Sequence, residues 1–306
     1  MKLFPKQFLG LDSTFTEYER SAVAALPIPY EGGCSYGKGA AKGPDAVLEA
    51  SCHLELYDEL LQTEPYRMGI ATVMPPKIYS DPESMQNAIY QSLVPLIQNG
   101  KFVVVMGGDH SVSIGYAKAL HEKYSRLSVI QLDAHADLRD VYDGSPFSHA
   151  CVMSRIREFT CDTLQIGIRS MSIEEARRVE RENMAVCTMS EYRSGKFDVN
   201  TAMDHLPDPV FLTLDVDVFD WSVVRSTGTP EPGGFLWDEA MALLQKIFAT
   251  KNIVGFDVVE LSYDSHDPNS AFAVAKLIYK MLGFKLAAEV RKGSLKWPDA
   301  PCGNLF

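Results

Sequence analysis

Short apolar runs recur along the chain and alternate with longer amphipathic stretches. The runs are rich in Val, Ile and Leu, are bounded by turn residues, and have the length of buried strands. They cover residues 22–28, 102–106, 128–132, 210–214 and 253–258. Between them, apolar residues recur at helical spacing over residues 113–124, 173–182, 237–249 and 271–282. Strands that alternate with helices predict an α/β fold with a parallel sheet and right-handed crossovers.

Nothing in the sequence divides the chain. Its 306 residues are enough for one large α/β domain or for two small ones. No low-complexity linker interrupts the alternation of apolar runs and amphipathic stretches, and no fixed-period repeat is visible. We therefore expect a single domain over residues 1–306.

Metal-ligating residue types follow four of the predicted strands, at the point where each strand ends. In open α/β sheets, ligands bind just beyond the carboxyl ends of the strands, so the fold would gather these side chains at one edge. The residues, in chain order, are His110, the trio Asp133, His135 and Asp137, the pair Asp215 and Asp217, and Glu260.

The spacing of these residues suits metal binding. Asp133, His135 and Asp137 alternate with alanines, and side chains at i, i+2 and i+4 of an extended segment share one face. Carboxylates combined with imidazoles favour Mn²⁺, with Fe, Co or Zn as alternatives. Two His and four Asp are too many ligands for one ion with an open position, but they suffice for two ions that activate a water molecule. Either acidic motif alone could cap a strand end instead, whereas their joint position favours the binuclear site.

The composition is that of a folded, acidic protein. The formal net charge is −11, with 46% hydrophobic and 23% charged residues. This balance argues against a nucleic-acid partner, which needs clustered Lys and Arg, and weakly favours a cationic substrate. We see no signal-peptide pattern, and no apolar stretch reaches the ~18 residues of a membrane span. The six cysteines are scattered without a CxxC pair, which fits reduced thiols in a cytoplasmic protein.

Six short motifs stand along the chain: GGDHS at 107–111, DAHAD at 133–137, SHA at 148–150, LDVD at 214–217, TGTPEPGG at 227–234 and DVVE at 257–260. These motifs resemble those of the ureohydrolase family, which includes arginase and agmatinase. Their order and spacing match over residues 20–285, which makes the resemblance specific. It implies a three-layer α/β/α sandwich around a mainly parallel eight-stranded sheet, and a homo-oligomer that is a trimer or a hexamer.

The resemblance also implies two Mn²⁺ per subunit. The first ion would be held by His110, Asp133, Asp137 and Asp215. The second would be held by His135, Asp133, Asp215 and Asp217. Asp133 and Asp215 would then bridge the two ions.

The same resemblance assigns the catalytic and substrate-binding residues. Glu260 matches the carboxylate that receives the substrate guanidinium, and a carboxylate has the fork geometry for it. Asp137 would deliver a proton to the leaving amine, His149 would relay protons near neutral pH, and Thr229 of TGTPEPGG would contact the substrate. The alternatives without a catalytic role are that His149 is an ordinary loop histidine and that Glu260 is an ordinary charge at a strand end. The segment after His149 departs from the family, because SHA followed by Cys151 replaces the commoner SHG.

The loop at residues 138–147 bears on the choice of substrate. It contains Asp140 and Asp143 but only one Arg, so it suits an ammonium tail better than a carboxylate; a solvated acidic loop is the alternative. The motif QIGIRS at 165–170 and residues 35–51 also resemble agmatinase more than arginase. We therefore expect hydrolysis of agmatine to putrescine and urea. Within the same family, the alternative substrates are arginine, guanidinobutyrate and formiminoglutamate. Outside this activity, the alternatives are a non-catalytic assembly partner and a binuclear phosphohydrolase. A phosphohydrolase would need basic residues near the metals.

Overall fold

All five predicted strands are present in the computed structural model, which describes residues 1–294. They are Val23–Ile28 (β1), Phe102–Gly107 (β3), Ser128–Leu132 (β4), Val210–Asp215 (β7) and Ile253–Val259 (β8). Three further strands were not predicted: Ile70–Thr72 (β2), Thr163–Ile168 (β5) and Ala185–Thr188 (β6). The first and last of these are too short for a pattern of period two to emerge, and β5 contains a polar Gln165 and a Gly167.

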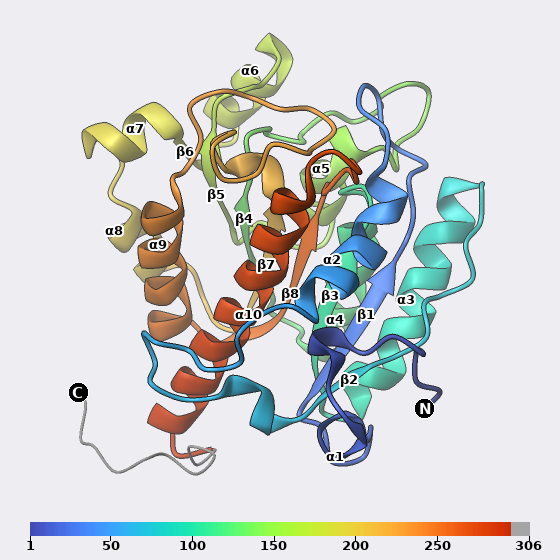
Figure 1. Cartoon of the computed structure of the whole chain (residues 1–306). Coiled ribbons are helices and arrows are strands. Elements are labelled where there is room, and N and C mark those ends of the chain that lie inside the picture. Colours follow the sequence, from blue (N-terminus) through green and yellow to red (C-terminus); the bar gives the residue numbers. More distant parts are fainter. Residues whose placement is uncertain (295–306) are drawn as a thin grey trace.

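The eight strands form one sheet in the order β2-β1-β3-β8-β7-β4-β5-β6. Every pairing between neighbouring strands is parallel, so the expected eight-stranded parallel sheet is confirmed. Since all strands run the same way, all their carboxyl ends meet at one edge, which is the upper edge in Figure 1. The loops that carry the predicted ligands follow β3, β4, β7 and β8, the four strands at the centre of the sheet.

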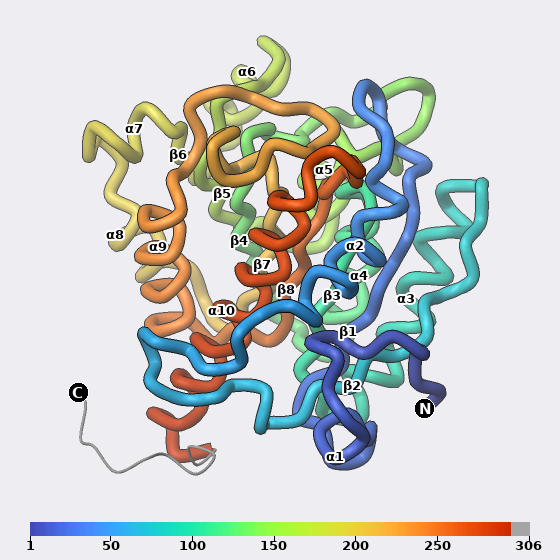
Figure 2. The backbone as a smooth tube through the Cα atoms, in the orientation of Figure 1, coloured from blue at the N-terminus to red at the C-terminus, as the bar shows by residue number. Residues whose placement is uncertain are grey.

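Helices cover both faces of the sheet and give the three expected layers (Figures 1 and 2). One face is covered by Gly43–Ser51 (α2), Trp237–Thr250 (α9) and Pro268–Arg291 (α10). The other face is covered by Pro82–Gln98 (α3), Val112–Lys123 (α4) and Val152–Ile156 (α5). The remaining α-helices are Ser13–Thr16 (α1), Ile173–Arg181 (α6), Met189–Ser194 (α7) and Val199–His205 (α8). No helix in residues 1–294 is long and apolar enough to cross a membrane.

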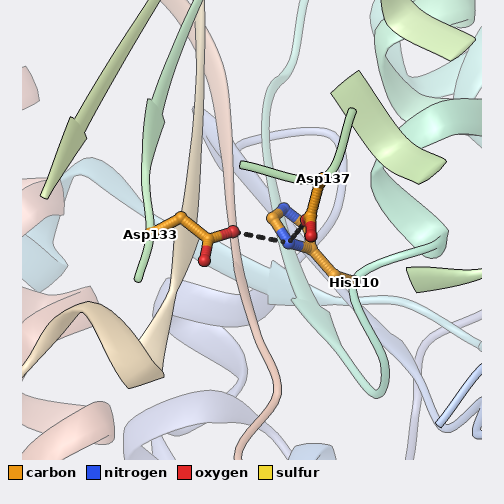
Figure 3. A group of neighbouring side chains, drawn as sticks. All are labelled: His110, Asp133 and Asp137. Carbon is orange, nitrogen blue, oxygen red and sulfur yellow. Dashed lines mark ion pairs between the residues drawn. The ribbon is translucent and has the colours of Figure 1, made fainter. Parts of the chain in front are cut away.

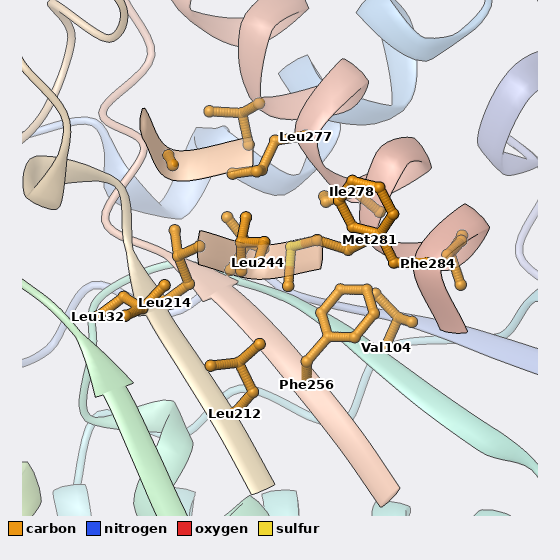
Figure 4. Close-up of a cluster of buried hydrophobic side chains, with 14 of the residues drawn as sticks. Val104, Leu132, Leu212, Leu214, Leu244, Phe256, Leu277, Ile278, Met281 and Phe284 are labelled. Carbon is orange, nitrogen blue, oxygen red and sulfur yellow. The ribbon is translucent and has the colours of Figure 1, made fainter. Parts of the chain in front are cut away.

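Alternating side chains of each strand feed two hydrophobic cores. Val104 belongs to the core under α10, whereas its neighbours Val103 and Val105 belong to the core under α3 and α4, as the period of two in a strand requires. Figure 4 shows the first core, where Phe256 of β8 lies close to Met281 of α10. Full burial of a side chain of this kind stabilises the fold by ~1.5–3 kcal/mol. The two packed cores therefore hold the strands whose carboxyl ends carry the site.

Candidate metal centre

One group of ligating side chains surrounds His110, on the loop that follows β3. Its Nδ1 lies 3.0 Å from Asp133 Oδ2 and 3.0 Å from Asp137 Oδ2 (Figure 3). A third carboxylate oxygen, Oδ2 of Asp215, lies 3.4 Å from the same nitrogen. All four side chains are buried. The ligand set that was predicted for the first ion is thus gathered around one imidazole nitrogen.

A second group surrounds His135 and includes Asp133 again. His135 Nδ1 lies 2.9 Å from Asp217 Oδ2 and 3.6 Å from Asp133 Oδ1. The two oxygens of Asp133 therefore face two different imidazoles, which is the arrangement that a bridging carboxylate needs. The ligand atoms of His110, Asp133 and Asp137 lie within 4.8 Å of one another, as do those of Asp133, His135 and Asp217, close enough for a shared metal ion. Asp215 belongs to neither of these two groups.

Unsatisfied buried atoms show that these residues fit metal ions. His110 Nδ1 is at ion-pair distance from three carboxylates but has no hydrogen-bond partner, and Asp217 Oδ2 has none either. The other ring nitrogen of His110, Nε2, lies 2.9 Å from Thr213 Oγ1, which leaves Nδ1 for a cation. Metal-ligating histidines typically have the second nitrogen engaged in this way. A pair of cations fits this donor set.

The electrostatics of the cluster also call for positive charge. Burial raises the pKa of Asp215 and of Asp217, and burial together with the charge of Asp133 raises the pKa of Asp137 to about 7. Although burial disfavours a charged imidazole, neighbouring carboxylates raise the pKa of His110 and bring that of His135 to about 12. The imidazoles would thus hold protons unless divalent cations balance the carboxylates instead.

Hydrogen bonds fix the orientation of the carboxylates. The Gln131 side chain on β4 donates to Asp133 Oδ2 at 2.7 Å, and the backbone N–H of His135 donates to Asp133 Oδ1 at 2.6 Å. On the neighbouring strand, the backbone N–H of Asp217 donates to Asp215 Oδ1 at 2.9 Å. Partners of this kind set the geometry of metal ligands. The sequence did not reveal Gln131, because a Gln inside an apolar run has no spacing signature.

Arg169 is a further residue that the sequence analysis did not single out. It follows β5, and its guanidinium donates to the backbone carbonyls of Asp217 at 2.6 Å and Glu231 at 2.8 Å. The side chain therefore ties the loop after β7 to the TGTPEPGG segment. Its position in QIGIRS, directly after a strand, was the available signal. A lysine could not reproduce these several bonds, because only arginine offers a fork of donors.

Two site residues have a strained backbone. Asp137 has φ of +53° and Glu260 has φ of +66°, both in the left-handed region that favours glycine. Such conformations in non-glycine residues cost about 1–3 kcal/mol and cluster at functional sites. The strain points to a positional requirement for these two carboxylates.

Glu260 and His149 face each other beside the metal-ligating cluster. Glu260 is buried, and its Oε1 accepts the backbone N–H of His110 at 2.7 Å. His149 Nδ1 lies 4.0 Å from the same oxygen, and His149 Nε2 lies 3.1 Å from Ser35 Oγ. Burial, together with the charges of His110 and His135, lowers the pKa of His149 to about 4. Burial also raises the pKa of Glu260, as does the nearby Asp109.

A cavity of about 260 Å³ opens next to this cluster. Among the residues predicted to act on the substrate, Asp137, His149 and Thr229 line it. The other three, Glu260, Asp140 and Asp143, are not among its lining residues. The carboxylate of Asp140 instead pairs with Arg178 at 3.3 Å and accepts Ser154 Oγ–H at 2.8 Å. The remaining wall contains residues that were not predicted, and Arg139, Tyr142 and Glu175 are the ones that could contact a substrate tail.

A parallel α/β/α sheet with a buried His and Asp cluster beyond its carboxyl edge defines the class of α/β proteins that carry a candidate metal centre at the edge of the sheet. Within that class, the chain belongs to the arginase family, a family of hydrolases whose family model matches residues 21–283. The expected resemblance to the ureohydrolases is confirmed.

Named relatives agree with this assignment. The chain is 40% identical over 290 residues to the N(1)-aminopropylagmatine ureohydrolase of Synechocystis, with 92% of this chain and 94% of the relative covered. It is 33% identical to the agmatinase of Pyrococcus horikoshii, with 92% and 99% covered. The crystal structure of the agmatine ureohydrolase of Thermoplasma volcanium superimposes with a TM-score of 0.82 at 24% identity, covering 94% of this chain and 97% of that one, which shows a shared fold.

Proposed function

We propose that the protein is a manganese-dependent hydrolase that releases urea from a guanidinoalkylamine of the agmatine class. The observation that carries the proposal is the position of Glu260: a buried carboxylate that accepts the backbone N–H of His110 at 2.7 Å, beside the ligating group around His110. A cationic, planar guanidinium matches a carboxylate in shape and charge. The backbone also leaves space there, since a Cβ built on Gly228 would lie 3.3 Å from Glu260 Oε2.

The residues of the chain have distinct parts in this reaction. Glu260 binds the guanidinium and holds its carbon toward the metal-ligating cluster. His110, Asp133, His135, Asp137, Asp215 and Asp217 would hold two Mn²⁺ ions, which when bound supply a nucleophile at neutral pH by lowering the pKa of water. Addition of water to the guanidinium carbon and cleavage of one C–N bond yield urea and an amine.

Proton delivery to the leaving amine falls to Asp137, with His149 as a relay. Asp137 Oδ2 lies 3.0 Å from His110 Nδ1, and its carboxylate lines the cavity, so it can accept a proton beside the metal-ligating cluster and pass it to the leaving amine. His149 lines the cavity and is mostly neutral at that pH, because its pKa is lowered to about 4. A neutral imidazole can accept a proton and pass it on.

The relatives favour a longer substrate than agmatine itself. The relative that is 40% identical is named for N(1)-aminopropylagmatine, whereas the one named agmatinase is 33% identical. We therefore propose N(1)-aminopropylagmatine as the preferred substrate, with agmatine second. Loss of urea from the first compound leaves an aminopropyl derivative of putrescine, and loss of urea from agmatine leaves putrescine.

One observation favours a second candidate, a guanidino acid. Arg139 lines the cavity, lies 5.2 Å over the Tyr142 ring and is 4.0 Å from Glu175. A guanidinium at this place could receive the carboxylate of arginine or guanidinobutyrate. The nearby carboxylate of Glu175 offsets that charge, so the amine remains the first choice.

A panel of guanidino compounds tests the proposal. Urea release by the Mn²⁺-loaded protein should give kcat/KM values that rank N(1)-aminopropylagmatine above agmatine, and both well above guanidinobutyrate and arginine. A ranking with either acid first would replace the substrate assignment and support the role of Arg139. Phosphate release from phosphomonoesters, without urea from any guanidino compound, would reject the reaction class.

We also propose that residues 1–306 form a single domain, and that the chain assembles as a homotrimer or hexamer in the cytoplasm. The support is the unbroken pattern of elements in the sequence and the family resemblance. Light scattering on the purified protein distinguishes a trimer or hexamer from a monomer or dimer.

A further inference from the structure

A second cavity, of about 480 Å³, lies on the same side of the sheet as the candidate metal centre but shares no wall residue with the cavity described above. Three separated segments build it: the turn before α2, the segment at 225–227 and the segment after β8. Backbone hydrogen bonds join these segments. Tyr263 N–H donates to Gly39 O at 3.1 Å, and Ser262 N–H donates to Ser226 O at 3.1 Å. The walls are therefore fixed by main-chain contacts.

Positive charge dominates these walls. Lys38, Lys42 and Arg225 line the cavity, against one lining carboxylate, Asp264. That carboxylate is exposed and already accepts the backbone N–H of His266 at 2.8 Å. Within residues 1–294, none of the three cations forms an ion pair with a carboxylate. All three are exposed, and the charge of Arg225 also acts on Asp267, which does not line the cavity. Three cations at one cavity are notable in a chain whose formal net charge is −11.

Two hydroxyl groups in the same walls have no hydrogen-bond partner. They are Thr227 Oγ1 and Ser262 Oγ, and both oxygens are buried. Ser262 as a residue is only 7% exposed, so its hydroxyl meets a ligand in the cavity only when the side chain turns toward it. Buried polar atoms in native proteins are almost always hydrogen-bonded, so these two hydroxyls are spare donors at the edge of a cavity that is lined by cations.

We propose that this cavity binds a small tetrahedral oxyanion, such as a free sulfate or phosphate ion or the phosphoryl group of a small metabolite. Ammonium, guanidinium and hydroxyl groups are all donors, and an oxyanion with several acceptor oxygens can engage them together. Charge-assisted hydrogen bonds from lysine and arginine to such oxygens are the strong ones. The inference is independent of the reaction at the metal centre.

Calorimetric titration of the full-length protein with sodium sulfate at low ionic strength tests the proposal. Sulfate stands in for the oxyanion because it does not precipitate Mn²⁺. We expect one site per chain in the wild type, and a dissociation constant at least about tenfold weaker in the Lys42→Ala/Arg225→Ala double variant. Lys38 is left unchanged, because its Nζ donates to Cys34 O at 3.0 Å next to the active site.

A matched control removes the same charge elsewhere. The Lys196→Ala/Lys246→Ala double variant loses two exposed lysines far from the cavity walls and should bind sulfate like the wild type. An unchanged thermal midpoint shows that both double variants are folded. Absence of sulfate binding in the wild type, equal weakening in both double variants, or binding that disappears when the metal is removed with a chelator would each overturn the proposal. The last result would place the anion on the metal ions.

Discussion

The backbone N–H of His110 donates a hydrogen bond of 2.7 Å to Glu260 Oε1, so the loops after β3 and β8 are joined at the site. A second bond, from Glu260 N–H to Gly108 O, also of 2.7 Å, closes the same contact from the other side. The carboxylate proposed to bind the guanidinium is therefore held at a fixed distance from a proposed metal ligand. Fixed placement of this kind lowers the cost of bringing substrate and nucleophile together.

Glu260→Gln tests the guanidinium role directly. The amide oxygen of Gln can still accept the His110 N–H, but the negative charge is lost. We expect kcat/KM for the preferred substrate to fall by about a hundredfold or more, because a charge-assisted pair in a buried site is replaced by a neutral one. Metal content should stay at the wild-type level. Glu174→Gln, on the exposed first turn of α6, is the matched control and should leave kcat/KM unchanged.

Asp133 should matter more for metal retention than His110. Its two oxygens face the imidazoles of His110 and His135, whereas His110 offers one nitrogen to one group. We expect Asp133→Ala to lose both ions and His110→Ala to keep one. The metal content of Asp215→Ala should be closer to that of Asp133→Ala than to that of His110→Ala. Elemental analysis after gel filtration measures the ions per chain. Greater loss in His110→Ala than in either aspartate variant would contradict the proposed sharing of ligands.

The two acidic residues of the 138–147 loop should behave differently. Asp140 is engaged with Arg178 and Ser154, whereas the charge of Asp143 acts on His149. We expect Asp143→Asn to lower kcat/KM for agmatine several-fold more than for arginine, since a charge near the cavity is only partly screened. Asn tolerates the φ of +49° that Asp143 adopts.

Asp140→Asn serves as the control for that comparison. It should leave the agmatine-to-arginine ratio unchanged and alter the free energy of unfolding by no more than ~1 kcal/mol, because the ion pairs of Asp140 are exposed. A change of the ratio of kcat/KM for agmatine to kcat/KM for arginine in Asp140→Asn but not in Asp143→Asn would contradict the proposed role of Asp143.

His149 should remain neutral throughout the physiological pH range. In the metal-free protein, burial, together with the positive charge of His110 and His135, lowers its pKa to about 4, below the ordinary value of 6.5. The unfolded chain thus binds this proton more readily, so the stability linked to His149 is complete above pH 6.5 and is lost as pH falls toward 4. An NMR titration of the imidazole proton signals of the metal-free protein measures the pKa. An inflection near pH 6.5, absent in His149→Asn, would contradict the proposed burial.

The sequence predicted the centre of the fold well because the central strands are buried on both faces. β3, with the sequence FVVVMG, and β7, with VFLTLD, are apolar runs that need no alternation to be recognised. The edge elements were missed for the opposite reason: β2 has three residues and β6 has four. Helix α3 was missed because Pro95 and several polar residues interrupt its apolar spacing.

The candidate site could be predicted only in part. Ligating residues carry a signal because His and Asp at strand ends are rare and regularly spaced, and the structure brings all six together. Residues that orient them carry less signal. Gln131 acts on Asp133, two positions away, but stands inside an apolar run, and Arg169 acts through contacts with residues 48 and 62 positions away. The direction of the Asp140 side chain was also out of reach, because it depends on Arg178 of α6, 38 positions away.

The central claim is that two metal ions, held by the six His and Asp side chains, drive urea release from a guanidinoalkylamine. The most direct measurement is the rate of urea release from N(1)-aminopropylagmatine as metal-free protein is loaded with Mn²⁺, with the bound ions per chain determined at each step. We expect the rate to rise steeply only as the second ion binds and to reach its maximum at two ions per chain. A full rate at one ion per chain, or no urea at two, would contradict the account.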